Sequence, residues 1–465
     1  MKAMLPTGSP REFGAPMPCA GRISVLDTLM LFQLQKPRPA CHRSCQIALH
    51  RVTALLAVAA FALPCGSARA ASEADTIVLT FVGDVGYSGN NTPVSAEGIS
   101  KRGFQRWRDT TDRIAQEING DLNFMNVETV VTERNDLPRD TKGQSGPFNF
   151  RTHPEGIAHL LRTGFNVFSL ANNHSMDYGV PGLEDTLRHV GALKRSGLKA
   201  AAGLGMNRNE ASSPQLIDVK GAKIAFSAIG IVTNNLERHR AGDDKPGQIA
   251  YRFDDDYALV RQRLKAAKAD VRILSIHYGT EGQVRTDNRQ IAEWRGAAAR
   301  KDGIDIIVGH HAHVVRGVEM AGNSLIMYGL GNFLHHGTAD ITGKGVCRDY
   351  GLMTRVHMHR ASTGKFAIGA IEAIPVTDTH MRPRPLQGSE GARRIHALNY
   401  LATTLDGADG ARGMRFTPQP NGTGLYCTDI GKAAKGELGK LCAGYTPAPP
   451  VSQIYARQIA ASCSR

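Results

Sequence analysis

Several features that are common in other protein classes are scarce or missing in this sequence. Eight cysteines occur in 465 residues, and none lies in the ligand-rich motifs described below, which argues against an iron–sulfur cluster or a thiolate-bound zinc. The apolar stretch 52–63 is too short to span a bilayer comfortably. No basic run with interleaved aromatic residues is present, so the sequence does not indicate a nucleic-acid partner.

A dinucleotide-binding fingerprint is also incomplete. Residues 199–205 contain two of the required glycines, but Asn207 and Arg208 stand where the third should follow, so we discard a nucleotide-binding fold. The composition, with 42% hydrophobic residues and 50 glycines, is typical of a globular and loop-rich protein. The length is sufficient for one large core or two smaller ones.

The first 70 residues have the pattern of an N-terminal extension with a signal peptide. A basic pair at 50–51 precedes the apolar stretch 52–63, and an Ala-Arg-Ala cleavage box follows at 68–70. We therefore expect a mature protein that begins near Ala71 and is periplasmic or secreted. An uncleaved anchor, or a true start downstream of Met1, is the alternative.

The remaining chain is positively charged. The formal net charge is +14, and residues 1–70 contain eight Lys or Arg and two acidic residues, which leaves +8 for the rest. An excess of positive charge favours acidic partners such as phosphate esters, polyanions or anionic surfaces.

Four cysteines remain after residue 70, three of them in the last 40 residues. In an oxidising compartment, one or two disulfides are expected rather than a metal site. We predict at least one disulfide, between Cys427 and Cys442, which are close enough in sequence to close a short loop. Residues 382–465 are rich in Gly, Pro and Thr with weak periodicity, and are predicted to form an irregular C-terminal segment pinned by disulfides.

Three histidines follow one apolar run. Residues 304–308 are typical of a buried strand, and His310, His311 and His313 come directly after it. Because His311 and His313 are two residues apart, a strand end or tight loop can direct both imidazoles at one point. Neutral imidazole is a common ligand of first-row metals, so the pattern favours a metal site over a solvated polar turn.

The same pattern, an apolar strand followed by ligand-type residues, occurs four more times. Alone, each is weak: a Gly-Asp pair is usually a turn, and a Glu on a strand can face water at a sheet edge. The four are Gly83-Asp84 after 76–82; Asn126 and Glu128 on 122–128; Asn172-Asn173-His174 with Asp177 after 165–171; and His277 with Glu281 after 271–276. Strands alternate with helical patterns, which predicts an α/β enzyme whose site crosses several loops.

In this order, and with Leu330-Gly331-Asn332-Phe333 after the last, the motifs resemble the CapA family of poly-γ-glutamate capsule synthesis proteins. That family is similar to the calcineurin-like metallophosphoesterases. The resemblance covers residues 76–376, and implies a CapA-like metallophosphatase domain there. The implied fold is a four-layer α/β/β/α metallophosphoesterase-like sandwich, which would be followed here by the irregular extension.

The resemblance also implies two divalent metal ions, and carboxylate, amide and imidazole ligands suit Mn, Fe or Zn. Glu128 would replace the bridging aspartate of the wider superfamily, and His174 matches the histidine that protonates the leaving group. Possible substrate or supporting residues are Asn126, Asp177, Glu281 and Asn332. Carried over residue by residue, the metal ligands are Asp84, Glu128, Asn173, His277, His311 and His313.

The chain departs from the wider superfamily at one position. The usual Asp-x-His pair is absent, because Gly86 stands two residues after Asp84. Asp177, Glu281 or a water could fill the gap, or the second metal could bind weakly.

Three functions fit these residues. The first is a metal-dependent hydrolase that uses metal-activated water on a phosphoester. The second is a non-catalytic accessory protein that binds an acidic polymer such as poly-γ-glutamate. The third is a hydrolase of γ-glutamyl amide bonds. The expected partners are an acidic polymer or phosphoester, and a capsule synthesis complex at the membrane.

Overall fold

The computed structural model describes residues 75–87, 92–143, 145–231, 236–299, 303–407 and 412–464. The predicted signal segment and its cleavage box lie outside these residues. Within the described ranges, no helix combines the length and the apolar character needed to cross a bilayer.

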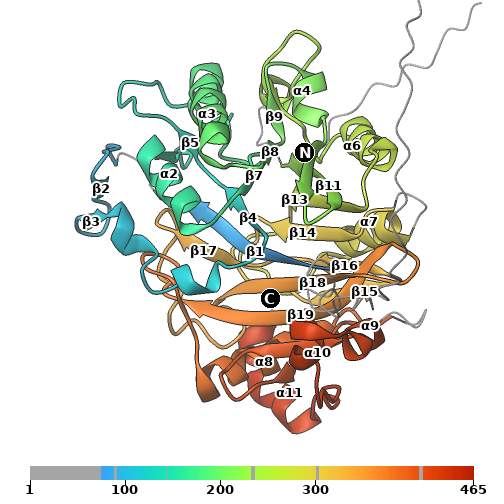
Figure 1. The fold of residues 1–465 in the computed structure, drawn as a ribbon. Coiled ribbons are helices and arrows are strands. Elements are labelled where there is room, and N and C mark those ends of the chain that lie inside the picture. The colour runs from blue at the N-terminus through green and yellow to red at the C-terminus, as the bar shows by residue number, and fades with distance from the viewer. Residues whose placement is uncertain are drawn as a thin grey trace, which may run out of the picture. The chain divides into compact units, whose positions relative to one another are not determined.

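A ten-stranded mixed sheet forms one half of the fold (Figure 1). Its strand order is β21-β22-β19-β18-β1-β4-β7-β8, with β17 paired to β1 and β20 to β19. Strands β1, β4, β7 and β8 run parallel, so their carboxyl ends share one edge. The bounds are β1 Thr76–Gly86, β4 Leu122–Val127, β7 Val167–Ser169, β8 Ala200–Ala202, β17 Asn332–His335, β18 Gly351–Arg360, β19 Phe366–Thr377, β20 Arg384–Pro385, β21 Thr417–Pro418 and β22 Gly424–Cys427.

A six-stranded sheet of order β10-β11-β13-β14-β16-β15 forms the other half. Strands β11, β13, β14 and β16 are parallel, and β10 and β11 form an antiparallel hairpin that turns at Lys220-Gly221. The bounds are β10 Gln215–Val219, β11 Ala222–Gly230, β13 Val271–His277, β14 Ile306–His310, β15 Val318–Ala321 and β16 Ser324–Met327. Three short ribbons pair β2 Gly98–Ile99 with β3 Gln105–Arg106, β5 Val130–Val131 with β6 Arg151–Thr152, and β9 Leu204–Gly205 with β12 Gly247–Gln248.

Helices α2 and α3 pack on the outer face of the larger sheet and α6 and α7 on that of the smaller sheet, whereas α8 packs against the core between the sheets (Figure 1). The α-helices are α2 Pro154–Thr163, α3 Gly179–Leu193, α4 Arg208–Ser212, α5 Leu236–His239, α6 Asp254–Ala266, α7 Asn288–Ala299, α8 Gly388–Thr403, α9 Asp429–Ala433, α10 Gly436–Leu441 and α11 Gln453–Ile459. The 3₁₀ helices are η1 Trp107–Thr110, η2 Ala115–Glu117, η3 Lys194–Ser196 and η4 Ala460–Cys463.

The sheets pack face to face through side chains that alternate along their strands. Phe124 of β4 stacks on Phe81 of β1 at a ring-centroid distance of 4.5 Å, and meets Phe226 of β11 edge-on at 5.5 Å. Successive side chains of a strand point to opposite faces, so the side chains between those of the inter-sheet core face the helices. Met125 thus belongs to a core shared with α2 and α3, and Leu274 of β13 to one shared with α6 and α7. The predicted four-layer α/β/β/α arrangement is confirmed.

The C-terminal segment differs from the prediction of irregular structure. It contains the 16-residue helix α8, and β22 pairs antiparallel with β19 as part of the larger sheet. Ile395, Leu398 and Leu401 are buried at helical spacing on α8. The Gly- and Pro-rich flanks obscured this apolar face in the sequence.

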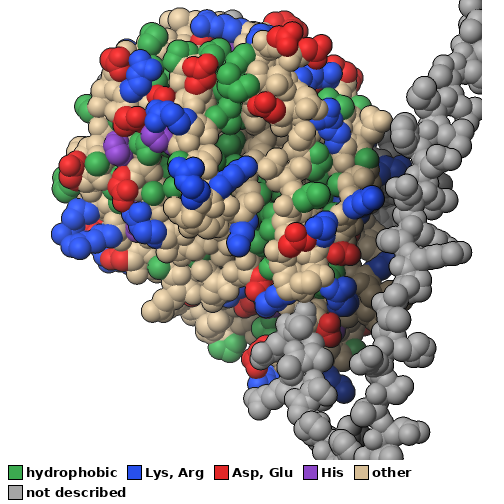
Figure 2. All heavy atoms as spheres, turned by 45° about the horizontal axis from the view of Figure 1, so that its top comes forward, with side chains coloured by type: hydrophobic (Ala, Val, Ile, Leu, Met, Phe, Trp, Pro, Cys, Tyr) green, Lys and Arg blue, Asp and Glu red, His purple; other side chains and the backbone are tan. Residues whose placement is uncertain are grey.

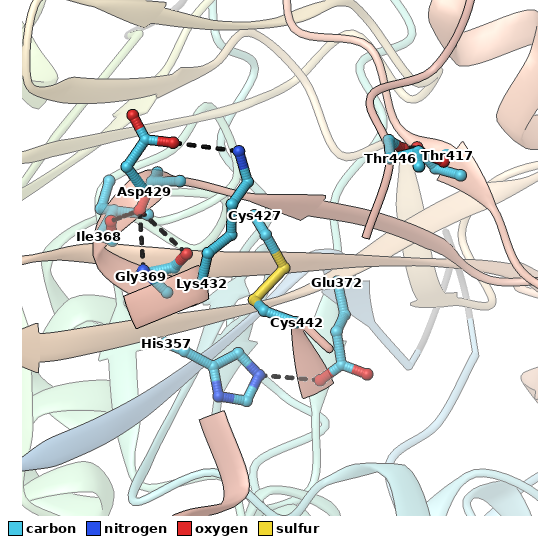
Figure 3. Close-up of a disulfide and its surroundings, with 12 residues drawn as sticks. His357, Ile368, Gly369, Glu372, Thr417, Cys427, Asp429, Lys432, Cys442 and Thr446 are labelled. Atoms are coloured by element: carbon cyan, nitrogen blue, oxygen red, sulfur yellow. Dashed lines mark hydrogen bonds and ion pairs between the residues drawn. A yellow bond between two sulfur atoms is a disulfide. The ribbon is translucent and has the colours of Figure 1, made fainter. Parts of the chain in front are cut away.

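Two disulfides involve this segment, one within it and one that ties it to the rest of the fold. Cys427–Cys442, the predicted pair, links β22 to the end of α10 (Figure 3). Cys347–Cys463 links η4 to the loop between β17 and β18. The Cys347–Cys463 bridge is buried together with Val314, which follows the three-histidine loop. The C-terminal segment therefore braces the edge of the sheets at which the candidate site lies.

Candidate metal centre

The predicted ligand residues meet where the carboxyl ends of the parallel strands of both sheets come together. Asp84 of β1 is in register with Asn126 of β4 and with Asn332 of β17. In the second sheet, His277 of β13 is in register with His310 of β14. The backbone oxygen of Gly331 accepts a hydrogen bond from Asp84 N at 3.0 Å. A β-carbon at Gly83 would lie 1.9 Å from that same oxygen, so only glycine permits this approach.

Glu128, one residue past β4, lies at the middle of the cluster. Its side chain is fully buried, and neither carboxylate oxygen has a hydrogen-bond partner among the described residues. Oε1 lies 3.4 Å from His277 Nε2, 3.9 Å from His313 Nε2 and 4.0 Å from His174 Nε2. Burying a carboxylate without partners is costly, and a bound cation removes that cost.

Two groups of side chains in the described residues have ligand atoms within 4.8 Å of one another, and Glu128 belongs to both. One group is Glu128, His277 and His311, and the other is Asp84, Glu128 and His313. Asn173 extends the first group, because its Oδ1 lies 2.6 Å from His277 Nε2. Carboxylate, amide and imidazole donors with a shared carboxylate fit a pair of divalent first-row metal ions. The chemistry of these donor atoms therefore fits a metal centre.

The loop that carries the histidines is conformationally strained. His311 has φ 84° and His313 has φ 54°, in the left-handed region that non-glycine residues rarely occupy. His311 N donates a hydrogen bond to Asp84 Oδ2 at 3.1 Å, which helps to hold the loop. Each such residue costs of order 1–3 kcal/mol, and such strain clusters at functional sites.

Electrostatic interactions inside the cluster are strong. Burial and the neighbouring Glu128 raise the pKa of Asp84, but hydrogen bonds from His310 and His313 outweigh them and hold it below its usual range. Burial lowers the pKa of His311 well below normal, and the nearby His277 and His313 lower it further. For His313, burial lowers the pKa, but Glu128 and Asp84 raise it to about 10. The two buried carboxylates thus concentrate negative potential at this point.

Comparison with known proteins identifies the family of the chain. Residues 78–336 match the family "Bacterial capsule synthesis protein PGA_cap", which is more than half of the chain. The chain belongs to this family. The matched span contains every residue of the cluster, from Asp84 to His335.

Curated relatives of the family are similar at moderate identity. The PGA biosynthesis protein CapA of Bacillus subtilis (strain 168) is 26% identical over 315 residues, 67% of this chain and 76% of that protein. The capsule biosynthesis protein CapA of Bacillus anthracis is 28% identical over 262 residues, 55% of this chain and 57% of that protein. A probable polyglutamine synthesis accessory protein of Mycobacterium tuberculosis is 27% identical over 219 residues, 46% of this chain and 55% of that protein.

Among solved structures, the sulfate thiohydrolase SoxB of Thermus thermophilus, in complex with glycerol, overlaps 60% of this chain and 41% of its own. The TM-score is 0.31 and the identity 13%. We draw no conclusion about this PGA_cap member from an overlap this low. Its fold follows from its own sheets and cores.

His174, the predicted catalytic residue, is buried beside the two groups. Its Nδ1 lies 2.7 Å from Asp177 Oδ2 and 3.1 Å from Lys142 Nζ, and its ring stacks on Phe150 at 4.0 Å. Lys142 and Asp177 form a buried ion pair. Burial lowers the pKa of His174 to about 4, against the opposing effect of Asp177. The ring is thus held at Nδ1, while Nε2 faces Glu128.

The remaining predicted residues support the cluster from its sides. Asn126 Nδ2 donates to Asp84 Oδ1 at 2.8 Å and lies 3.1 Å from His277 Nδ1. Asn332 Oδ1 lies 2.8 Å from His313 Nδ1. Glu281 is 63% exposed at its side chain and reaches His311 Nε2 at 3.9 Å.

Sequence reasoning missed three residues at the site. Lys142 lies in a polar loop between β5 and β6, and no sequence pattern sets it apart. His310 was noted in its motif but given no role, and its Nδ1 lies 3.1 Å from Asp84 Oδ1. His335, at the end of β17, lies 3.4 Å from Glu128 Oε2 through its Nε2. The sequence signal for His335 was its place after the Gly-Asn-Phe motif.

A cavity of about 430 Å³ opens beside the cluster. His174, His313, Asn332 and Glu281 line it, together with Phe148 and Phe150. Lys344 and Arg348 contribute two positive charges. Arg348 Nε is buried without a hydrogen-bond partner in the described part of the chain. The cavity thus joins the candidate metal ligands to a pair of cations.

Proposed function

We propose that this chain is an exported metal-dependent hydrolase of capsule-polymer metabolism that cleaves a phosphoester. The observation that carries the proposal is the carboxylate of Glu128, whose two buried oxygens lack hydrogen-bond partners among the described residues and which belongs to both ligand groups. Asp84 and His313 would hold one cation, and Asn173, His277 and His311 would hold the other, with Glu128 common to both groups. Bound divalent cations would supply Lewis acidity and a water of lowered pKa as the nucleophile.

The residues of the chain supply positioning and proton transfer. His174 presents Nε2 to the cluster, because Asp177 and Lys142 hold its other nitrogen. When Nε2 carries a proton, the ring is therefore placed to pass it to the departing ester oxygen. Phe150 stacks on the ring and excludes water from that face.

The substrate is recognised through its negative charge within the cavity. Lys344 and Arg348 lie in the same cavity as His174 and His313, so an anionic group can contact them while an ester reaches the cluster. On the face shown in Figure 2, Lys and Arg side chains alternate with Asp and Glu. Recognition is therefore attributed to this local pair of cations rather than to the overall charge.

The link to capsule polymers is supported by the family and by the names of the two Bacillus relatives. Export is supported by the two disulfides, because disulfides persist in oxidising compartments. The link to capsule polymers and the export of the protein are both parts of the proposal.

The test combines metal content with turnover. Purified wild-type protein is stripped with chelator, reloaded with Mn²⁺, Fe²⁺ or Zn²⁺, and assayed on phosphodiesters, phosphomonoesters and poly-γ-glutamate. His311→Ala and His313→Ala should lose bound metal and activity together. His174→Ala should retain metal near the wild-type level and lose roughly 10²–10⁴-fold in turnover.

The competing function is a protein that binds an acidic polymer without cleaving it. If this function is correct, the metal-loaded wild type turns over no substrate in the panel, and His174→Ala binds the polymer with unchanged affinity. That result would refute the hydrolase proposal. Release of glutamate from poly-γ-glutamate without phosphoester turnover would assign the site to amide hydrolysis instead.

A further inference from the structure

One histidine beside Glu128 lies outside the two ligand groups and outside the residues predicted from the sequence. His335 is fully buried, and neither ring nitrogen has a hydrogen-bond partner among the described residues. Its Nε2 lies 3.4 Å from Glu128 Oε2, the oxygen opposite the one nearest His277 and His313. Its ring centroid lies 5.3 Å from that of His313. Burial of an imidazole that makes no hydrogen bond is costly, and this ring lies against the carboxylate that the two ligand groups share.

The space for this imidazole exists because residue 86 has no side chain. Gly86 of β1 is paired in parallel register with His335 of β17. A β-carbon at residue 86 would lie 2.9 Å from His335 Nε2 and 3.1 Å from the backbone oxygen of Glu128. Gly86 is not among the glycines with positive φ, so its backbone does not require glycine. The glycine provides room, and the imidazole of His335 occupies it.

The two residues expected to fill the gap after Asp84 have other contacts. Asp177 is paired with Lys142 and His174, and its Oδ2 also accepts from Phe150 N. Glu281 is mostly exposed and reaches His311 rather than Asp84. His335 contacts the shared carboxylate directly and comes from the strand that pairs with β1.

We propose that His335 is a metal ligand that completes the Asp84–Glu128–His313 group, and that it supplies from β17 the imidazole that position 86 lacks. The inference rests on metal binding in the proposed function, and it adds a residue to that site. A hydrogen bond that merely orients Glu128 is the competing role. Because Glu128 is common to both groups, loss of an orienting residue would weaken both metal ions, whereas loss of a ligand weakens one.

The strand offers a matched control. His336 follows His335, is also buried, and also has two ring nitrogens without partners among the described residues. Its ring packs near Tyr87, at a centroid distance of 5.6 Å, whereas the ring of His335 lies against Glu128. His336→Gln removes a buried imidazole from the same segment without touching the cluster.

The purified protein is stripped of metal and titrated with Mn²⁺, with stoichiometry measured by elemental analysis and affinity by calorimetry. Wild type and His336→Gln should bind two ions. His335→Gln should bind one ion with unchanged affinity and a second at least about tenfold more weakly, since a direct ligand is worth no less than an outer-shell partner. The double variant Gly86→His, His335→Gly should regain the second ion, because it returns the imidazole from the β1 side.

Each outcome has one meaning. Two ions with unchanged affinity in His335→Gln overturn the inference and leave the proposed function intact. Equal weakening of both ions assigns His335 to orientation and also overturns it. No metal in the wild type refutes the proposed function itself, and the inference with it. Folding of each variant is checked by its unfolding midpoint in chelator. If His335→Gln does not fold, a folded double variant decides the result, because recovery of the second ion supports the ligand role and its absence refutes it.

Discussion

The ion pair of Lys142 and Asp177 is predicted to stabilise the protein through a strong and measurable coupling. Both side chains are at most 2% exposed. Removing one partner of a buried pair leaves an uncompensated charge, which typically costs 3–5 kcal/mol. In Asp177→Asn, the amide oxygen can still accept from Phe150 N, but the amide nitrogen faces the Lys142 ammonium, so two donors oppose each other. We expect this variant to lose about 3–5 kcal/mol of unfolding free energy.

The partner substitution should cost less. In Lys142→Met, the Asp177 carboxylate keeps two neighbours, Phe150 N and His174, so we expect a loss of about 1–3 kcal/mol. The double variant removes both charges and should be clearly less destabilised than the sum of the single variants. The expected coupling energy is about 2 kcal/mol or more.

The assay is denaturant unfolding of metal-free protein at one pH, followed by fluorescence and circular dichroism, with coincident transitions and an unchanged m-value required. The control is the same cycle on Lys432 and Asp429, an exposed pair 3.0 Å apart (Figure 3), for which the coupling should be near zero. A coupling within about 0.5 kcal/mol of zero for Lys142 and Asp177 would refute the reasoning.

Three further predictions follow from other parts of the molecule. Lys344→Gln and Arg348→Gln should raise KM for anionic substrates and leave kcat and metal content near wild type; an unchanged KM in both would remove the cavity from substrate binding. Burial raises the pKa of Asp305 to about 6 from an ordinary 3.8, so the stability that Asp305 contributes is lost as pH rises through this window. Asp305→Asn keeps the acceptor for Arg272 N. It should raise the unfolding free energy by up to about 2 kcal/mol at pH 7.5 and have little effect near pH 4. Cys427→Ser with Cys442→Ser should cost about 3 kcal/mol without changing KM, whereas Cys347→Ser with Cys463→Ser should also raise KM, because that bridge adjoins Arg348 in the cavity wall; identical KM values for the two pairs would contradict this.

The sequence was informative where ligand-type residues follow apolar strands. Asp84, Glu128, Asn173, His277 and His311 each stand at or just beyond a strand of a parallel set, and parallel strands bring their carboxyl ends to one edge. Their convergence could therefore be predicted from pattern alone. The roles of these residues in binding metal stay predictions until an ion is measured.

Other features depend on contacts that no local pattern encodes. Lys142 reaches His174 from a polar loop that resembles any solvent-exposed connection. His335 becomes relevant only because β17 returns beside β1 and Gly86 leaves space. Helix α8 was predicted as irregular because glycine and proline near its ends outweighed its apolar spacing. For Lys142 and His335 the deciding partner lies far away in the sequence.

The most direct test of the account is an anomalous-scattering map of crystals of the protein loaded with Mn²⁺. The account predicts two peaks separated by about 3.5–4 Å, with Glu128 between them, one peak beside Asp84 and His313 and the other beside His277 and His311. A map without a peak in this cluster, from protein shown to be folded and metal-saturated, would contradict it.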